Sequence, residues 1–212
     1  MSPWLNLMVG LALGLNLLAL ASGRLPSLIR SAAAQGMVLG CLPLLLGHGG
    51  WTTLAFAACT VAVKGFLIPA LLRRALRASH IDREVEPIIG YVPSLLLGAA
   101  ATVASVALSD ALPLRPEHAG SLLAAGSFAT LFTGLLLLIG RAKAISQVCG
   151  YLILENGIYL FGLLLIRAMP VIVEAGILLD LTVAVFVIGI IVDRIQREFD
   201  TLDTRKLSAL RE

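Results

Sequence analysis

Four ionisable side chains lie inside long apolar stretches of the sequence, where a charge is energetically costly. They are Lys64, Glu155, Glu174 and Asp180. A charged side chain at the centre of a membrane-spanning helix costs roughly 2.5 to 3.5 kcal/mol on insertion scales, and such residues commonly mark ion or proton pathways. Burial opposes the charged form of acids and bases alike, so these groups can exchange protons near neutral pH. We therefore predict that the four residues form a proton relay.

The depth of each group follows from its place in the apolar stretch that contains it. Glu155 and Asp180 lie near the middle of two successive stretches, so their carboxyl groups are expected at similar depth as the central relay. Lys64 lies roughly 4 Å past the centre of its helix, toward the cytoplasmic side. We expect it to act as a basic relay station or as a modulator of the pKa of its neighbours. Glu174 precedes Asp180 by about 9 Å along the helix and by about 120° around it, as a contributor in the outer half.

Three polar side chains are predicted to support Glu155. Tyr151 and Tyr159 lie four residues before and after it and share its helical face, where they can hydrogen-bond to it or simply pack. Asn156 is polar at the same depth. A purely structural role stays open for the charged residues, as hydrogen-bonding groups between helices, an ion pair, a lysine reaching toward the interface, or an interfacial charge.

The composition is that of a membrane protein. The chain has 212 residues, of which 58% are hydrophobic and 14% charged, with a mean hydropathy of +0.96. In a soluble domain, roughly a quarter of the residues are charged. A helix of about 20 apolar residues spans a bilayer. These values exclude a soluble enzyme, a β-barrel and a disordered chain. We predict an all-α, polytopic transmembrane bundle of seven helices, at about 3–22, 31–48, 51–72, 88–109, 119–140, 145–168 and 169–192.

The distribution of basic residues predicts the topology. With seven spans, thirteen Lys and Arg residues fall on one side and only Arg115 and Arg167 on the other. Cytoplasmic loops carry the excess of basic residues, so the N-terminus is expected outside as an uncleaved anchor and the C-terminus in the cytoplasm. We divide the chain into a four-helix part (1–112), a three-helix part (113–192) and a cytoplasmic tail (193–212).

No motif predicts catalysis or cofactor binding in this chain. Cys41, Cys59 and Cys149 lie in apolar stretches without CxxC spacing, so no disulfide framework, iron–sulfur cluster or zinc site is expected. A Gly-rich phosphate loop, a HExxH helix and a GxSxG turn are absent. Membrane insertion accounts for the basic residues, so we expect no nucleic-acid partner. Chemistry that needs a water-exposed cleft must belong to a partner protein.

The sequence after about residue 141 resembles a known family. The stretches AISQVCGYLILENGIYLFG, MPVIVEAGILLD and REFDTLDTRKLSALRE are similar to component E of the hydrogenase-4 type of membrane-bound nickel–iron hydrogenase complexes. The resemblance implies a bacterial or archaeal inner (plasma) membrane. It implies as partners antiporter-like membrane subunits, a complex I H-type membrane subunit and the hydrogenase large and small subunits. It further implies that the nickel–iron centre and the iron–sulfur clusters are held by these partners.

In that family the last three helices resemble the K-type subunit of respiratory complex I, which carries two intramembrane glutamates. Matching Gly150 and Asn156 to the K-type Gly-Leu-Glu-x-x-x-Asn pattern puts Leu152 at the first glutamate, with Glu155 one turn further along the same face. Asp180 falls where the second glutamate is expected. The resemblance thus implies a displaced carboxyl and a shortened one on the same path.

Our first interpretation is a non-redox subunit of a hydrogenase-4-type or complex I-like energy-converting complex, which helps to translocate protons or sodium ions. One alternative is a subunit of a multisubunit cation/proton antiporter or of a nickel-free hydrogenase-related complex. Another is a structural membrane scaffold, in which the charged residues only bind helices together.

Overall fold

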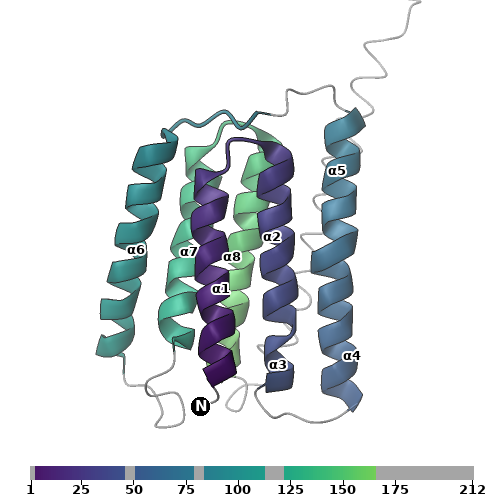
Figure 1. Ribbon diagram of the computed structural model, residues 1–212, viewed down its shortest axis with the longest axis vertical. Helices are drawn as coiled ribbons and strands as arrows, with labels where there is room; N and C mark the ends of the chain where they lie inside the picture. Colours follow the sequence, from purple (N-terminus) through teal and green to yellow (C-terminus); the bar gives the residue numbers. More distant parts are fainter. Residues whose placement is uncertain (1–2, 46–50, 79–83, 113–121, 166–212) are drawn as a thin grey trace, which may run out of the picture.

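A computed structural model describes residues 3–45, 51–78, 84–112 and 122–165 of the chain. The described residues form helices that lie side by side, with α6 at one side, the α4–η1–α5 helix at the other, and α1, α2, α7 and α8 between them (Figure 1). The elements are α1 (Pro3–Ala21), α2 (Leu25–Gly40), α3 (Leu42–Leu45), α4 (Trp51–Thr60), the π-helix η1 (Val61–Leu67), α5 (Ile68–Ala78), α6 (Tyr91–Ala111), α7 (Leu123–Gly140) and α8 (Ala144–Leu165).

Six helices of the described part are long and apolar enough to cross a membrane. They overlap the first six predicted spans, and the all-α membrane fold is confirmed. The predicted seventh span, 169–192, lies outside the described residues together with Glu174 and Asp180. The number of seven spans, the orientation of the termini, the division at residue 112 and the tail at 193–212 stay predictions.

Two predicted boundaries are wrong because helices continue through charged residues. The second helix begins at Leu25 instead of residue 31, with a proline in its first turn, where the missing N–H costs nothing. Arg30 therefore lies within this helix. The third span continues to Ala78 because its last turns are amphipathic, with Leu76 buried and the neighbouring arginines exposed. The segment between the predicted third and fourth spans, 73–87, thus loses its first six residues to this helix.

One end of the bundle, which we call the basic end, joins three pairs of helix ends. There α1, α5 and α7 end and α2, α6 and α8 begin, and segment 84–90 crosses it. Backbone hydrogen bonds tie this segment to both neighbouring turns, from Val85 N to Gly23 O (2.9 Å) and from Ala142 N to Glu86 O (3.0 Å). A third bond, from Ile88 N to Gly140 O (2.9 Å), satisfies a carbonyl that the end of α7 leaves unpaired.

Arg141 anchors the basic end from within. Its side chain is buried and donates hydrogen bonds to Leu20 O at 2.7 Å and to Ile89 O at 3.3 Å. Its guanidinium carbon also lies 5.2 Å from the centre of the Tyr91 ring. A cation beside the last carbonyls of a helix is favoured by the helix dipole. Arg141 thus connects the ends of α1 and α7 to the start of α6.

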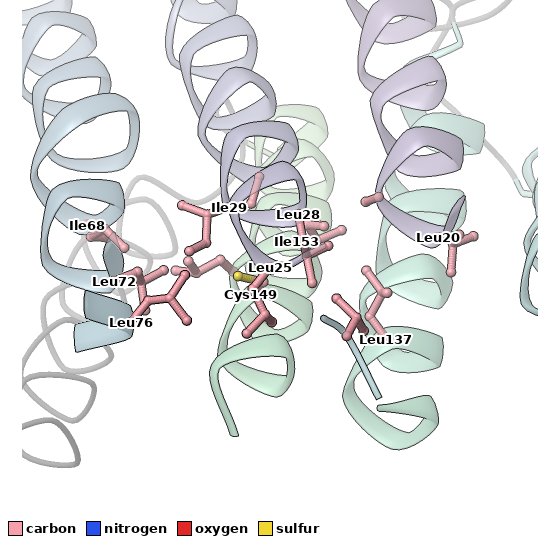
Figure 2. Packing of buried hydrophobic residues seen from close by; sticks show 14 residues of the cluster. Leu20, Leu25, Leu28, Ile29, Ile68, Leu72, Leu76, Leu137, Cys149 and Ile153 are labelled. Carbon is pink, nitrogen blue, oxygen red and sulfur yellow. The ribbon is translucent and has the colours of Figure 1, made fainter. Parts of the chain in front are cut away.

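Buried apolar side chains form two separate clusters along the bundle. The basic-half cluster takes side chains from α1, α2, α5, α7 and α8 near the basic end, and Figure 2 shows ten of them labelled. The opposite-half cluster lies toward the other end. The first contains Ala19, Leu20, Leu25, Leu28, Ile29, Ala32, Ile68, Leu72, Leu76, Val85, Leu137, Cys149, Leu152 and Ile153, and the second Leu5, Val9, Ala12, Leu39, Leu42, Leu123, Leu160 and Leu163.

The tightest packing joins α7 to α8 through small residues. A methyl group placed on Gly157 of α8 would lie 2.6 Å from the backbone nitrogen of Leu131 in α7. Small residues allow membrane helices to approach until their backbones touch. This close approach fixes α8, and the polar residues that it carries, against the rest of the bundle.

We predict that Gly157→Ala destabilises the protein because the added methyl group pushes α8 away from the α7 backbone. Overpacking of this kind costs about 1 to 3 kcal/mol. Gly10→Ala is the matched control, since a methyl group there meets no atom of the described residues within 4 Å. The thermal unfolding temperature in detergent should fall for the first variant only. Equal unfolding temperatures for both variants would contradict the packing.

Candidate functional site

Lys64 enters the bundle from a locally widened helix. It lies in the π-helix η1, in the middle of the continuous helix from Trp51 to Ala78. The N–H of Ile68 there bonds to Val63 O, five residues back. Widened turns of this kind are frequently found at functional sites. Gly36 of α2 lies opposite, where a methyl group would be 2.8 Å from the Lys64 Cβ, so glycine permits the approach of the two helices.

Lys64 forms a buried ion pair with Glu155 of α8. The distance from Lys64 Nζ to Glu155 Oε1 is 3.1 Å, and the exposed fractions of the two residues are 7% and 3%. Charges buried in a low-dielectric interior persist only when they are paired. Glu155 Oε1 has no hydrogen bond within the described part of the chain, so this oxygen interacts with the ammonium through charge.

A chain of amide side chains extends from this pair across the bundle. Lys64 Nζ donates to Asn156 Oδ1 at 3.1 Å, and Asn156 Nδ2 donates to Gln35 Oε1 at 3.2 Å. Gln35 Nε2 donates to Asn16 Oδ1 at 2.6 Å, and Asn16 Nδ2 donates to Thr130 Oγ1 at 3.0 Å. These side chains belong to η1, α8, α2, α1 and α7 in turn. We call Asn156, Gln35 and Asn16 the amide chain.

The lysine sets the direction of every amide in this chain. An ammonium group can only donate hydrogen bonds, so Asn156 must turn its carbonyl oxygen toward Lys64. The amino group of Asn156 then requires an acceptor, and the same argument orients Gln35 and Asn16 in sequence. The oxygens of all three amides therefore lie on the side of Lys64, and their dipoles add along the chain.

The ion pair, the amide chain and Thr130 form one polar layer at mid-depth. In each of four helices, the polar residue lies between a residue of the opposite-half cluster and one of the basic-half cluster. The sequence of apolar, polar and apolar residues is Ala12, Asn16 and Ala19 in α1, Ala32, Gln35 and Leu39 in α2, Leu123, Thr130 and Leu137 in α7, and Ile153, Glu155–Asn156 and Leu160 in α8. The layer is thus enclosed by apolar packing above and below.

A small pocket opens on the basic-half side of Lys64 and Asn156, with room for about one water molecule. Apolar side chains of α2, α5 and α8 form the rest of its wall. They are Ile29, Ala32, Ala33, Ile68, Pro69, Leu72 and Leu152. Among the described residues of the lining, Lys64 and Asn156 carry the polar side chains.

The structure brings together three of the residues predicted for the site, Lys64, Glu155 and Asn156. Tyr159 contacts the site through its ring, whose centre lies 5.7 Å from Lys64 Nζ, while its buried hydroxyl has no hydrogen bond among the described residues. Tyr151 is half-buried and packs against the basic-half cluster. Glu174 and Asp180 lie outside the described residues.

Sequence reasoning missed Asn16, Gln35 and Thr130. All three are buried polar residues near the middle of apolar helices, and a search for amides as well as charges inside the spans would have found the first two. Among the described residues, no group of His, Cys, Asp and Glu has the geometry of a metal site.

Comparison with known proteins decides the family. The chain is 31% identical over 164 residues to hydrogenase-4 component E of Escherichia coli, an alignment that covers 74% of this chain and 73% of that protein. This chain belongs to the hydrogenase-4 component E family. It is also 34% identical over 192 residues to the uncharacterized protein Rv0085 of Mycobacterium tuberculosis, covering 89% and 87% of the two chains.

No protein-family model and no solved structure matches the chain. The relationship to hydrogenase-4 component E of Escherichia coli confirms the predicted resemblance at the level of the family. The similarity of the last three helices to a K-type subunit stays a prediction. As a component E homologue with membrane-spanning helices, the protein fits a membrane subunit of a hydrogenase-type complex.

We predict that Lys64→Met and Glu155→Leu each destabilise the protein far more than the double variant does. Breaking a buried pair leaves an uncompensated charge and costs about 3 to 5 kcal/mol, whereas replacing both partners by apolar residues is often close to neutral. The test is the free energy of unfolding in mixed detergent micelles, measured for the original protein, the two single variants and the double variant.

Glu86→Gln is the matched control for this cycle. It removes an ion pair of the same length, 3.1 Å to Lys143, but the Glu86 side chain is 64% exposed. Such a pair contributes less than about 1 kcal/mol after screening by solvent. Additive losses in the Lys64/Glu155 double variant would show that the two charges do not compensate each other.

Proposed function

We propose that this hydrogenase-4 component E homologue is a non-redox subunit of an energy-converting complex in the plasma membrane, and that its Lys64–Glu155 pair holds a proton in transit. The observation that carries the proposal is the buried ion pair at 3.1 Å in the middle of the bundle. A charge pair is a poor way to bind helices, because apolar residues of similar volume often stabilise as well or better. The presence of this pair in an apolar interior is better explained by proton chemistry.

The pair can pass one proton for each proton that it receives. An arriving proton binds Glu155 Oε1 and forms a neutral carboxylic acid. The attraction between Lys64 and Glu155 is then weakened, and the Lys64 ammonium releases one N–H proton to the next acceptor and becomes a neutral amine. The carboxylic acid then returns its proton to Nζ across 3.1 Å, which breaks the O–H bond, forms an N–H bond and restores the ion pair.

The amide chain is suited to hold this pair and not to carry its protons. Side-chain amides neither gain nor lose protons in the physiological range, so the proton must leave by another group. We propose Asp180 and Glu174, the other two carboxyls of the predicted relay, as the next acceptors. The ammonium at 3.1 Å from Glu155 also repels a sodium ion, which favours protons over sodium as the transported species.

The redox chemistry belongs, under this proposal, to the partners. We expect the nickel–iron centre and iron–sulfur clusters in hydrogenase large and small subunits, and lateral contacts with antiporter-like and H-type membrane subunits. The support is the relationship to proteins named hydrogenase-4 component E. Coupling then requires that a change at the redox centre alters the proton affinity of groups within the membrane.

We predict that the protein, tagged at its C-terminus and extracted in mild detergent, co-purifies with antiporter-like subunits and a nickel–iron hydrogenase large subunit. Mass spectrometry identifies the partners, and metal analysis measures nickel and iron. Recovery with antiporter subunits but without metal would replace this assignment by a cation/proton antiporter or a nickel-free relative. Recovery without any of these subunits would contradict both.

We predict that Glu155→Gln lowers proton translocation by the complex in inverted membrane vesicles while assembly and hydrogenase activity persist. The amide is close in shape to the carboxyl but cannot accept the arriving proton. Loss of one acid–base group typically lowers a rate by about 10²- to 10⁴-fold. Quenching of a pH-sensitive dye measures translocation, with Glu86→Gln as the control carboxyl. Unchanged quenching in the Glu155 variant would leave the pair a structural role only.

A further inference from the structure

We infer that Gln35 and Asn16 are positioning residues, which act through Asn156 to hold the shared proton on Lys64 instead of on Glu155. This inference deepens the proposed function and rests on it for its importance to transport. Their effect passes through the hydrogen bonds from Asn156 to Gln35 and from Gln35 to Asn16.

Two arrangements of one proton compete at this site. In the ion pair, Lys64 is an ammonium and Glu155 a carboxylate. In the neutral pair, one N–H bond of Lys64 has broken and an O–H bond has formed at Glu155 Oε1, so both groups are uncharged. The atoms exchanging the proton are 3.1 Å apart, and burial in a low-dielectric interior favours the neutral pair. Something in the structure must therefore favour the ion pair if it is to persist.

The amide chain favours the ammonium in two ways. Asn156 Oδ1 accepts a hydrogen bond from Lys64 at 3.1 Å, and hydrogen bonds to charged groups are stronger than those to neutral ones. The three amide oxygens also lie on the Lys64 side, so the negative ends of their dipoles face the positive charge. Because hydrogen bonds in a chain polarise one another, Gln35 and Asn16 strengthen the acceptor that Asn156 presents.

Glu155 receives no corresponding help in the described part of the chain. Its Oε1 atom is buried without a hydrogen bond there, so the charged carboxylate is stabilised mainly by Lys64 itself. Tyr159 of α8 contributes its ring, 5.7 Å from Lys64 Nζ, which again favours the cation. The residues of α2 and α5 that line the adjoining pocket are uncharged. Within the described residues, the amide chain and the Tyr159 ring thus both favour the positive charge on Lys64.

The position of the proton can be measured without transport. Infrared spectroscopy of the full chain in lipid nanodiscs at neutral pH detects the carbonyl band of a protonated carboxyl, which an ionised carboxylate lacks. The band that disappears in Glu155→Gln belongs to Glu155. We expect this band to be weak in the natural sequence and to grow about fivefold or more in Gln35→Met, since a hydrogen bond is worth roughly 1 kcal/mol.

A graded series separates electrostatic support from loosened packing. Asn156→Leu removes the direct acceptor and should give the strongest Glu155 band, Gln35→Met a smaller one, and Asn16→Leu a smaller one still. Ser127→Ala is the matched control, because it removes a buried hydroxyl of α7 that bonds to Ala124 O of its own helix. It should leave the band unchanged. If size exclusion and circular dichroism show that Gln35→Met is unfolded, the inference is still tested by the other two variants. The Glu155 band should then be stronger in Asn156→Leu than in Asn16→Leu.

Two outcomes would overturn the inference. One is a Glu155 band that stays weak in both Asn156→Leu and Gln35→Met. The other is an equal increase in all variants including Ser127→Ala, which would point to general loosening of the bundle. These results are separate from the fate of the proposed function. A graded band together with normal translocation in Glu155→Gln would refute the transport role alone, and the reverse combination would refute the role of the amide chain alone.

Discussion

Compensation of the Lys64 charge is the constraint on which the rest of the structure depends. An ammonium group in the middle of an apolar bundle requires a counter-ion and hydrogen-bond acceptors within a few ångströms. Glu155 supplies the first at 3.1 Å and Asn156 the second at the same distance. The close approach of η1 to α2 at Gly36 brings the lysine backbone near enough for both contacts. Once Asn156 has turned its oxygen toward the lysine, the orientation of the whole amide chain follows.

The two apolar clusters determine what kind of site this compensation produces. They lie on either side of the polar layer in the described helices and leave next to Lys64 a pocket for about one water molecule. A dry surrounding strengthens each electrostatic interaction within the layer and makes each unpaired group more costly. A small change in the charge of one residue in the polar layer therefore changes the electrostatic energy of its neighbours. The apolar packing on both sides of the layer opposes a continuous water path along the described helices, so under the proposed function protons pass between side chains of the layer and those beside it.

The membrane fold could be read from the sequence because apolar length is a strong signal, and the structure agrees on six spans. The helix boundaries near Arg30 and Arg73 could not be predicted from the sequence. Amphipathic turns there carry arginines on an exposed face while the opposite face stays buried. Lys64, Glu155 and Asn156 were predictable because polar groups in apolar helices are costly. Their pairing was not, because it depends on how distant helices pack and on the widened turn at η1. The roles of Asn16 and Gln35 required the same long-range information, as uncharged amides give a weaker signal than charges.

The amide chain also bears on why the chain has helices before α7 and α8. If the last three predicted helices correspond to a K-type subunit, as the resemblance implies, then Glu155 and Asn156 belong to the shared part and Lys64, Gln35 and Asn16 to the additional helices. The hydrogen bonds of Asn16 with Thr130 and of Gln35 with Asn156 cross that predicted boundary. The additional helices therefore do more than enlarge the subunit. They supply the cation that neutralises the glutamate and the dipoles that support the cation, which under the proposed function prepares Glu155 for proton exchange.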